Sequence, residues 1–154
     1  MRRSERRITS RKTIDAIISE ADVCRIAFAV GNVPYIVALS FGYDPGGAGT
    51  LYFHGAPEGR KMEMMKKNNL VCFAMDTDHK LYGKNKACGW SMKYKSIVGY
   101  GKLSLVRDNI ERIKALNLIM DHYGAQGLYN YDEKNLARTA ILRLDITEIS
   151  GKQA

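Results

Sequence analysis

The strand–loop–helix segment that contains Arg60 and Lys61 combines residue types that suit the binding of a phosphate group. Residues 51–54 are rich in aromatic residues and predict a β-strand, and residues 62–68 favour a helix. A helix N-terminus exposes unpaired backbone N–H groups and a partial positive charge, so it can hold an anion. Arg60 and Lys61 would add two full positive charges there. The segment therefore predicts a phosphate site, with an ordinary connection carrying solvated basic residues as the alternative.

Two glycines support the phosphate interpretation, although the common nucleotide motifs do not fit. Gly55 and Gly59 would allow a ligand to approach the backbone closely. They are separated by three residues, and Met62 follows Lys61, whereas a P-loop has four residues between its glycines and then Lys-Ser/Thr. No hydroxyl is placed to hold magnesium, so nucleoside triphosphate hydrolysis is not expected. The glycine cluster within residues 44–50 opens no helix and predicts a hairpin turn, not a dinucleotide fingerprint.

The composition predicts one globular domain spanning residues 1–154. Apolar residues make up 45% of the chain and charged residues 26%, which are ordinary values for such a domain. The net charge of +8 comes largely from the basic segment 1–12, which holds six basic residues and one acidic residue. A terminal basic segment is more often a solvated tail than a binding arm, and no RNA-recognition motif is present. No nucleic-acid partner is therefore expected.

The three cysteines and residues 76–79 do not predict a metal site. Cys24, Cys72 and Cys88 are odd in number and widely spaced, which argues against a disulfide framework or zinc and favours the cytoplasm. Cys24 and Cys72 lie in apolar stretches and are expected to be buried. Residues 76–79 include two aspartates and a histidine, but adjacent loop positions rarely converge on one ion, so a solvated turn is expected. Neither a signal peptide nor a membrane span is expected.

Apolar periodicity predicts six strands and three helices. The strands are expected at 23–30, 34–43, 51–54, 70–75, 93–106 and 139–149, and the helices at 13–20, 59–68 and 108–124. Strand 34–43 is nearly all apolar, which predicts burial on both faces, and residues 125–135 are expected to form a loop. Asp108 and Glu111 form a capping box for the third helix, whose inner stripe is predicted to comprise Ile110, Ile113, Leu116 or Asn117, and Met120. The order favours a small antiparallel barrel with helices packed outside.

Four segments carry a resemblance to a known family. They are residues 24–28, residues 34–43, residues 54–61 and residues 87–101, and their order and spacing match over nearly the whole chain. The chain resembles the flavin-binding split-barrel superfamily of pyridoxamine 5′-phosphate oxidase, and within it the branch of the 5-nitroimidazole resistance proteins. The resemblance implies a mainly β (α+β) fold, a six-stranded antiparallel split β-barrel with flanking helices. The C-terminal Arg and Trp pattern of the true pyridoxamine oxidases is not recognisable in residues 142–152, so oxidation of vitamin B6 is not expected.

The resemblance also implies a cofactor, a partner and a set of site residues. The cofactor is flavin mononucleotide (FMN), and the partner is a second copy, with two flavin sites at the homodimer interface. Arg60 and Lys61 would hold the phosphate, while His54 and Gly55 would flank the ring. The remaining expected contacts are the backbone of Ile36, Val37, Ala38 and Leu39, and the closing residues Trp90, Tyr94 and Ser96, which could come from the partner subunit.

Three functions remain open at this stage. The first is an oxidoreductase that passes electrons from reduced flavin to a small acceptor such as a nitroaromatic compound or a quinone. The second is a flavin carrier or sensor without a substrate, and the third is a haem-binding split barrel. His54 is the candidate catalytic residue, as a proton donor or a contact to the substrate, because imidazole exchanges protons near neutral pH. The alternative is that His54 only packs against the flavin or forms a hydrogen bond to it.

Overall fold

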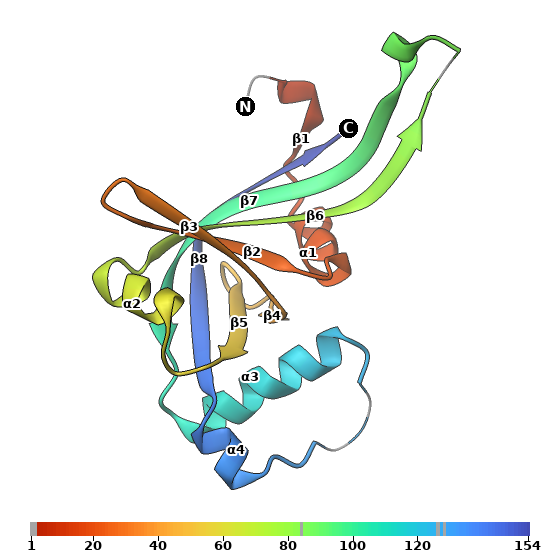
Figure 1. Ribbon diagram of the computed structural model, residues 1–154. Coiled ribbons are helices and arrows are strands. Elements are labelled where there is room, and N and C mark those ends of the chain that lie inside the picture. Colours follow the sequence, from red (N-terminus) through yellow and green to blue (C-terminus); the bar gives the residue numbers. More distant parts are fainter. Residues whose placement is uncertain (1–2, 84, 126, 128) are drawn as a thin grey trace.

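The computed structural model describes residues 3–83, 85–125, 127 and 129–154. An antiparallel sheet forms the body of the protein, and most of the helices pack around it (Figure 1). The strands are β1 (Arg7–Ile8), β2 (Cys24–Val30), β3 (Val33–Leu39), β4 (Phe41–Asp44), β5 (Thr50–Gly55), β6 (Leu70–Tyr82), β7 (Ser91–Leu105) and β8 (Ala140–Gln153). The helices are α1 (Arg11–Glu20), α2 (Arg60–Lys67), α3 (Asn109–His122) and α4 (Glu133–Ala137), with 3₁₀ turns η1 (Ser4–Arg6) and η2 (Ala87–Gly89).

The order of the strands explains how the sheet becomes a barrel that stays open on one side. Along the sheet the strands run β3-β2-β6-β7-β8-β5-β4, and β1 pairs with β8. The two ends of this path, β3 and β4, are neighbours in the chain and are separated only by Ser40. The sheet must therefore curl until its two ends meet at Ser40, where the chain joins them without a ladder of hydrogen bonds. This confirms the predicted split-barrel class.

The number of strands is the main difference from the sequence-based expectation of six. The predicted strand 34–43 is divided at Ser40 into β3 and β4, because the chain passes there from one end of the sheet to the other. The short strand β1 adds to the edge of β8. Residues 76–82 extend β6 beyond the predicted end at residue 75, and α4 occupies part of the predicted loop 125–135. The division at Ser40 and the addition of β1 raise the number of strands from six to eight.

The interior of the barrel is filled by alternate residues of the strands. Phe28, Phe53, Phe73 and Ile97 are almost completely buried there. In β8 the predicted alternation is confirmed, since Ala140, Leu142, Leu144 and Ile146 are all buried. Burying a Phe, Ile or Leu side chain contributes roughly 1.5–3 kcal/mol, so these positions supply much of the stability of the body.

Helix α3 packs on the outside of β4 and β5, and it turns a different face to them than predicted. Ala115 and Ile119 are buried, whereas Ile110 is 82% exposed and Met120 is also exposed. The predicted inner stripe is therefore wrong at both of its ends, although Leu116 packs against a buried cluster as predicted. Gly42 in β4 provides the reason, because a Cβ atom there would lie 2.6 Å from the backbone nitrogen of Ile119. The helix backbone approaches β4 so closely that the strand position facing it has no room for a side chain, which explains the glycine at position 42.

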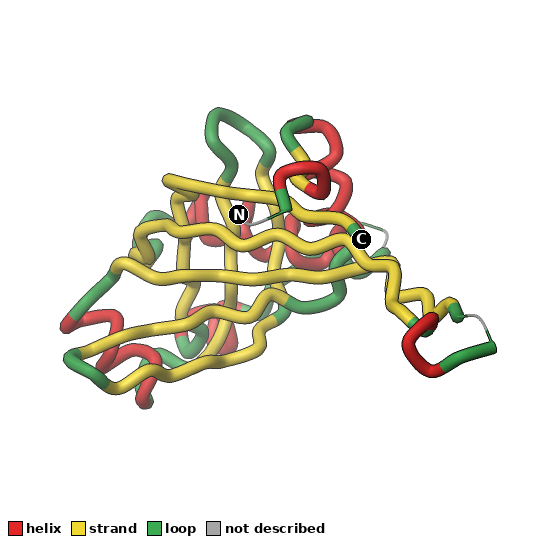
Figure 2. The backbone as a smooth tube through the Cα atoms, turned by 90° about the horizontal axis from the view of Figure 1, so that it is seen from above, coloured by secondary structure: helices red, strands yellow, loops and turns green. Residues whose placement is uncertain are grey.

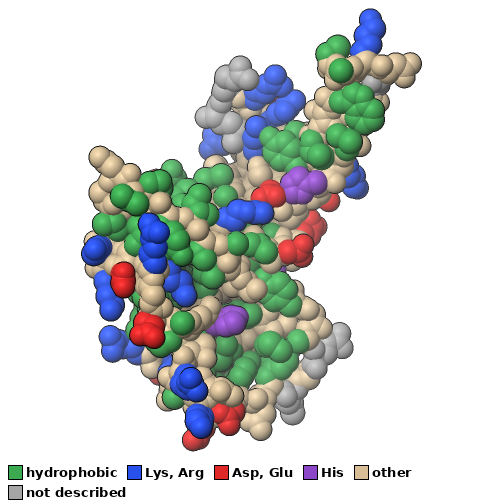
Figure 3. Space-filling model, in the orientation of Figure 1, with side chains coloured by type: hydrophobic (Ala, Val, Ile, Leu, Met, Phe, Trp, Pro, Cys, Tyr) green, Lys and Arg blue, Asp and Glu red, His purple; other side chains and the backbone are tan. Residues whose placement is uncertain are grey.

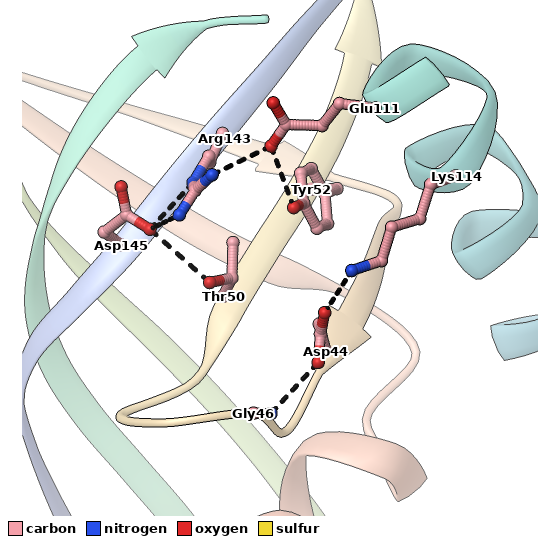
Figure 4. A network of polar contacts seen from close by, with 8 residues as sticks. All are labelled: Asp44, Gly46, Thr50, Tyr52, Glu111, Lys114, Arg143 and Asp145. Carbon is pink, nitrogen blue, oxygen red and sulfur yellow. Dashed lines mark hydrogen bonds and ion pairs between the residues drawn. The ribbon is translucent and has the colours of Figure 1, made fainter.

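The N-terminus of α3 is capped as predicted, but its glutamate has another partner. Asp108 Oδ1 accepts a hydrogen bond of 2.9 Å from the backbone N–H of Glu111. The Glu111 carboxylate accepts hydrogen bonds from the Tyr52 hydroxyl at 3.1 Å and from Arg143 Nη1 at 2.9 Å, and Arg143 also pairs with Asp145 (Figure 4). These contacts tie α3 to β5 and β8. Burial and the Glu111 carboxylate raise the pKa of Tyr52 to about 12.

The distal part of the β6–β7 hairpin projects from the body as an arm, whose described residues are 78–83 and 85–93 (Figures 1 and 2). Its apolar side chains are exposed, including Leu81, Tyr82, Trp90 and Met92. The cysteines differ in burial: Cys24 is buried, which raises the pKa of its thiol to about 12, Cys72 is half-buried, and Cys88 on the arm is exposed. Within the described residues, no helix is long and apolar enough to cross a membrane.

Candidate functional site

Strand β3 lies at one end of the sheet and leaves an apolar face open. Tyr35, Val37 and Leu39 pack toward the core, whereas Ile36 and Ala38 point outward, and Ile36 is 65% exposed. The prediction that this segment is buried on both faces is therefore wrong. Strand β3 pairs only with β2, so the other edge of its backbone is without a strand partner among the described residues. An edge strand with free N–H and C=O groups and exposed apolar side chains is a surface that a ligand or another chain can cover.

The start of α2 contacts β3 at Tyr35 and the end of β5 at Gly55. Gly59 has a φ of +102°, a conformation that favours glycine, and it leads directly into Arg60. The Arg60 guanidinium lies 4.7 Å from the centre of the Tyr35 ring on β3, a cation–π contact. The Lys61 side chain reaches back over Gly55 at the end of β5, where a Cβ atom would lie 2.9 Å from Nζ. The structure thus brings the two cations together with β3 and β5.

His54 occupies the end of β5, beside Gly55. It pairs with Ile141 of β8, and its side chain is exposed although the preceding residues 51–53 are buried. Because side chains alternate along a strand, His54 lies on the same side of β5 as Tyr52. Tyr52 is held by the polar network around Glu111 (Figure 4), so the strand that carries His54 is fixed in position while its imidazole remains accessible.

Trp90, Tyr94 and Ser96 lie in a different part of the molecule. Trp90 stands between η2 and β7, is 55% exposed, and stacks on Gly83 of the arm. Ser96 of β7 pairs with Asp76 of β6. The residues paired across the sheet from Ile36 are, strand by strand, Ala27 of β2, Cys72 of β6 and Tyr100 of β7. Ser96 is therefore three strands across and four residues along from Ile36, or about 14 Å by about 13 Å.

The predicted site residues therefore form two groups in one chain. Ile36, Val37, Ala38, Leu39, His54, Gly55, Gly59, Arg60 and Lys61 belong to β3, the end of β5 and the start of α2, whereas Trp90, Tyr94 and Ser96 belong to β7 and the arm. One protomer does not bring the second group onto the end of the first that carries Arg60 and Lys61.

Sequence reasoning missed two features. Tyr35, the platform under Arg60, is one. The other is a polar cluster at the base of the arm, where Asp76 accepts from Arg25 at 2.8 Å and pairs with His79 at 3.1 Å. A bulge between Thr77 and Lys80, with Asp78 at φ +58°, turns His79 toward Asp76, so the predicted solvated turn is in fact a bulged strand. No group of three potential metal ligands occurs among the residues that the structure describes.

Comparison with known proteins decides the family. Residues 10–153 match the family model described as pyridoxamine 5′-phosphate oxidase. The chain belongs to this family. No curated protein matches the sequence significantly.

Solved structures agree with the family assignment. The crystal structure of a candidate 5-nitroimidazole antibiotic resistance protein from Bacteroides thetaiotaomicron is similar to this chain, with 32% sequence identity and a TM-score of 0.83. The match covers 96% of this chain and 86% of that one. The FAD and heme binding protein from Mycobacterium smegmatis is 19% identical with a TM-score of 0.83, over 97% and 73% of the two chains. The flavocytochrome Anf3 from Azotobacter vinelandii is 20% identical with a TM-score of 0.81, over 96% and 69%. The last two likenesses establish the shared fold.

Proposed function

We propose that the protein binds FMN along β3 and passes electrons from the reduced flavin to a small organic acceptor, such as a nitroaromatic compound or a quinone. The observation that carries this proposal is the position of Arg60 and Lys61 at the start of α2, where Arg60 stacks on Tyr35 of β3 and Lys61 reaches Gly55 at the end of β5. Relatives named for flavin binding and for nitroimidazole resistance support it.

The phosphate half of the proposal rests on charge and backbone geometry. Hydrogen bonds between a cationic side chain and a phosphate contribute about 1.5–3 kcal/mol each. The contact with Tyr35 restrains Arg60, and the contact with Gly55 places Lys61 at the end of β5, so less conformational entropy is lost when an anion binds. The backbone N–H groups of the first turn of α2 add a partial positive charge.

The ring half of the proposal rests on the open side of β3. The isoalloxazine ring is flat and mostly apolar, with hydrogen-bonding groups along one edge. The exposed side chains of Ile36 and Ala38 offer an apolar surface, and the unpaired backbone edge of residues 36–39 offers donors and acceptors. His54, exposed at the end of β5, would contact the reactive edge of the ring or the acceptor.

The proposal includes a homodimer in which each subunit completes the site of the other. Val98 and Tyr100 are exposed on the same outward-facing side of the sheet as Ile36, and the arm extends this apolar surface beyond the body. Two-fold dimers are the commonest homo-oligomers. A dimer formed through this side of the sheet would bring Trp90, Tyr94 and Ser96 of one subunit toward the flavin of the other. Within one subunit, these residues are too far from the phosphate-binding end.

The test begins with the visible absorption spectrum of the purified protein, followed by release and identification of the cofactor. A flavin spectrum with released FMN is expected, and a haem spectrum without flavin would overturn the proposal. The double variant Arg60→Ala/Lys61→Ala should bind FMN at least about 100-fold more weakly, because two charge-assisted hydrogen bonds are lost. The matched control, Lys12→Ala/Lys66→Ala, removes two exposed cations elsewhere and should retain FMN. Equal affinity of the two double variants would contradict the assignment.

A further inference from the structure

A basic hollow lies where the arm leaves the body of the protein. Three lysines, one aspartate and the end of β8 are among its lining residues, which include Asp78, Lys80, Lys93, Lys95 and Gln153. Its volume of about 270 Å³ is near the lower end of small-molecule sites, roughly 300 Å³. None of the described lining residues belongs to β3, β5 or α2, so the hollow is separate from the place proposed for the flavin phosphate.

The strand register gives the arm one basic side and one apolar side. Lys93 and Lys95 precede the buried Ile97 by four and two residues, so they continue the core-facing side of β7. Leu81 and Met92, which pair with each other across the hairpin, lie on the opposite side. The face of the arm that is visible in Figure 3 carries mainly hydrophobic side chains. The basic side is therefore a second surface, distinct from the apolar side that the proposed dimer would cover.

Two of the three lysines face each other directly. Lys80 of β6 pairs with Lys93 of β7, and directly opposite residues have their Cβ atoms about 4.5–5.5 Å apart. Lys95 lies two residues further along β7, roughly 7 Å from Lys93. Like charges directly opposite each other destabilise a pair of strands. The apolar side chains of the arm are exposed, so burial within one subunit offsets little of this repulsion.

The aspartate of the hollow compensates only one of the lysines. The bulge in β6 places Asp78 beside Lys95, and the Asp78 Oδ2 atom lies 2.7 Å from Lys95 Nζ. The hydrogen bond between them lowers the pKa of Asp78 and raises the pKa of Lys95. Lys80 and Lys93 form no ion pair with any residue that the structure describes, and Lys93 Nζ lies 5.5 Å from the centre of the Tyr82 ring. Two positive charges therefore remain uncompensated at the hollow.

These charges suit a small ligand that carries two negative charges. Each ammonium group offers three donors, and its hydrogen bonds to anionic oxygens are charge-assisted. Gln153, which pairs with Lys95 from β8, adds an uncharged amide donor to the same hollow. A monoanion would leave one of the two facing lysines uncompensated. Phosphate monoesters and dicarboxylates combine two negative charges with a size that such a hollow can hold.

We propose that this hollow binds a small dianion, either a phosphate monoester or a dicarboxylate, and that the bound anion stabilises the arm. The anion would lie between Lys80 and Lys93 and replace their mutual repulsion by two attractive contacts. The proposal goes beyond the proposed function, because it requires no contact with a flavin. The shared chemistry is a pair of anionic oxygens, and the two sources are separated by experiment.

The binding test uses inorganic phosphate and succinate as probes, and sodium chloride at the same ionic strength as the control for screening. Trp90 is the single tryptophan of the chain and lies on the arm, so its fluorescence reports on this region. The full-length protein carries Arg60→Ala/Lys61→Ala, so that phosphate bound at the start of α2 is not counted. In this background, Lys93→Glu reverses a charge inside the hollow, and Lys102→Glu reverses an exposed charge on the same strand outside it.

The expected result is saturable binding of at least one dianion, with a dissociation constant of about 1 mM or lower. Lys93→Glu should weaken it by at least about tenfold, because an attractive contact becomes repulsive, and Lys102→Glu should change it less than about twofold. A response to phosphate assigns the hollow to a phosphate monoester, and a response to succinate assigns it to a dicarboxylate. The same change with chloride at equal ionic strength, or equal behaviour of the two variants, would overturn the proposal.

Hydrogen exchange of the arm amides tests the second half of the proposal. With the dianion at ten times its dissociation constant, these amides should exchange about tenfold more slowly, because the arm must release the ligand before it opens. Lys93→Glu should slow the exchange without any ligand, because the new carboxylate faces Lys80 across the hairpin. This result also shows that the variant loses the site and not the structure of the arm. Exchange that the dianion leaves unchanged would overturn the stabilisation of the arm.

Discussion

The body of the barrel and the β3–arm surface use the same apolar residue types in opposite ways. In the body, Phe53 and Leu142 are paired on adjacent strands, and their side chains are buried in the core of the barrel. On β3 and the arm, Ile36 and Trp90 are more than half exposed. The difference teaches that apolar residues in this chain have two environments: those in the body stabilise the fold, and those on the open surface stay accessible, as the proposed flavin and dimer contacts require.

The sharpest contrast between the two regions is expected in stability. Phe53→Ala should lower the free energy of unfolding by about 3–5 kcal/mol, because it removes a completely buried ring and leaves a cavity. Ile36→Ala, measured on the same apoprotein by chemical denaturation, should change it by about 0.5 kcal/mol or less. If Ile36→Ala lowered the free energy of unfolding as much as Phe53→Ala, the Ile36 side chain would be packed within the single chain. The contrast between the body and the β3–arm surface would then be wrong.

The end of β5 should separate activity from cofactor retention. If His54 exchanges a proton with the acceptor, His54→Gln should lower turnover by about 10²–10⁴-fold while flavin binding stays nearly intact. The matched variant is His79→Gln, which replaces the exposed histidine at the base of the arm. Weaker flavin retention with unchanged turnover per bound flavin would instead make His54 a packing or hydrogen-bonding residue.

The arm should affect the cofactor without affecting the barrel. Trp90→Ala removes an exposed ring, so the secondary structure should be unchanged. Flavin retention is expected to fall by about tenfold, because in the proposed dimer the flat isoalloxazine ring packs against the Trp90 side chain. Light scattering should show a dimer for the wild-type protein. A stable wild-type monomer with full flavin occupancy would count against the proposed contribution of the partner subunit.

The smallest effect is expected from the polar network that fixes α3 to the body. Burial, together with the Glu111 carboxylate, raises the pKa of Tyr52 to about 12, from the ordinary value near 10 for an unfolded chain. The contribution of Tyr52 is fully present below pH 10 and is lost as the pH rises from about 10 to 12, because only the unfolded chain ionises in that window. Tyr52→Phe should make the decline in unfolding free energy over this window shallower, as measured by denaturation at several pH values. If the unfolding free energy of Tyr52→Phe declined with pH as steeply as that of the wild-type protein, Tyr52 would not be the group that causes the decline.

The sequence by itself determined the features that depend on near neighbours. Asp108 capped α3 because an aspartate side chain reaches the backbone N–H three residues later. The alternation in β8 identified its buried face, and Gly59 followed by Arg60 located the start of α2. The four segments with family resemblance led to the split-barrel fold, which the structure and the family match confirm.

The tertiary structure decided which surfaces are covered. An apolar strand is buried only if another element packs on it, and β3 became an edge strand because Ser40 carries the chain to the far end of the sheet. The inner face of α3 was set by Gly42, which lies more than 60 residues earlier and permits a close approach to Ile119. The separation of Ser96 from Ile36 depended on the order of four strands, and strand order is fixed by long-range pairing that local residue patterns do not encode.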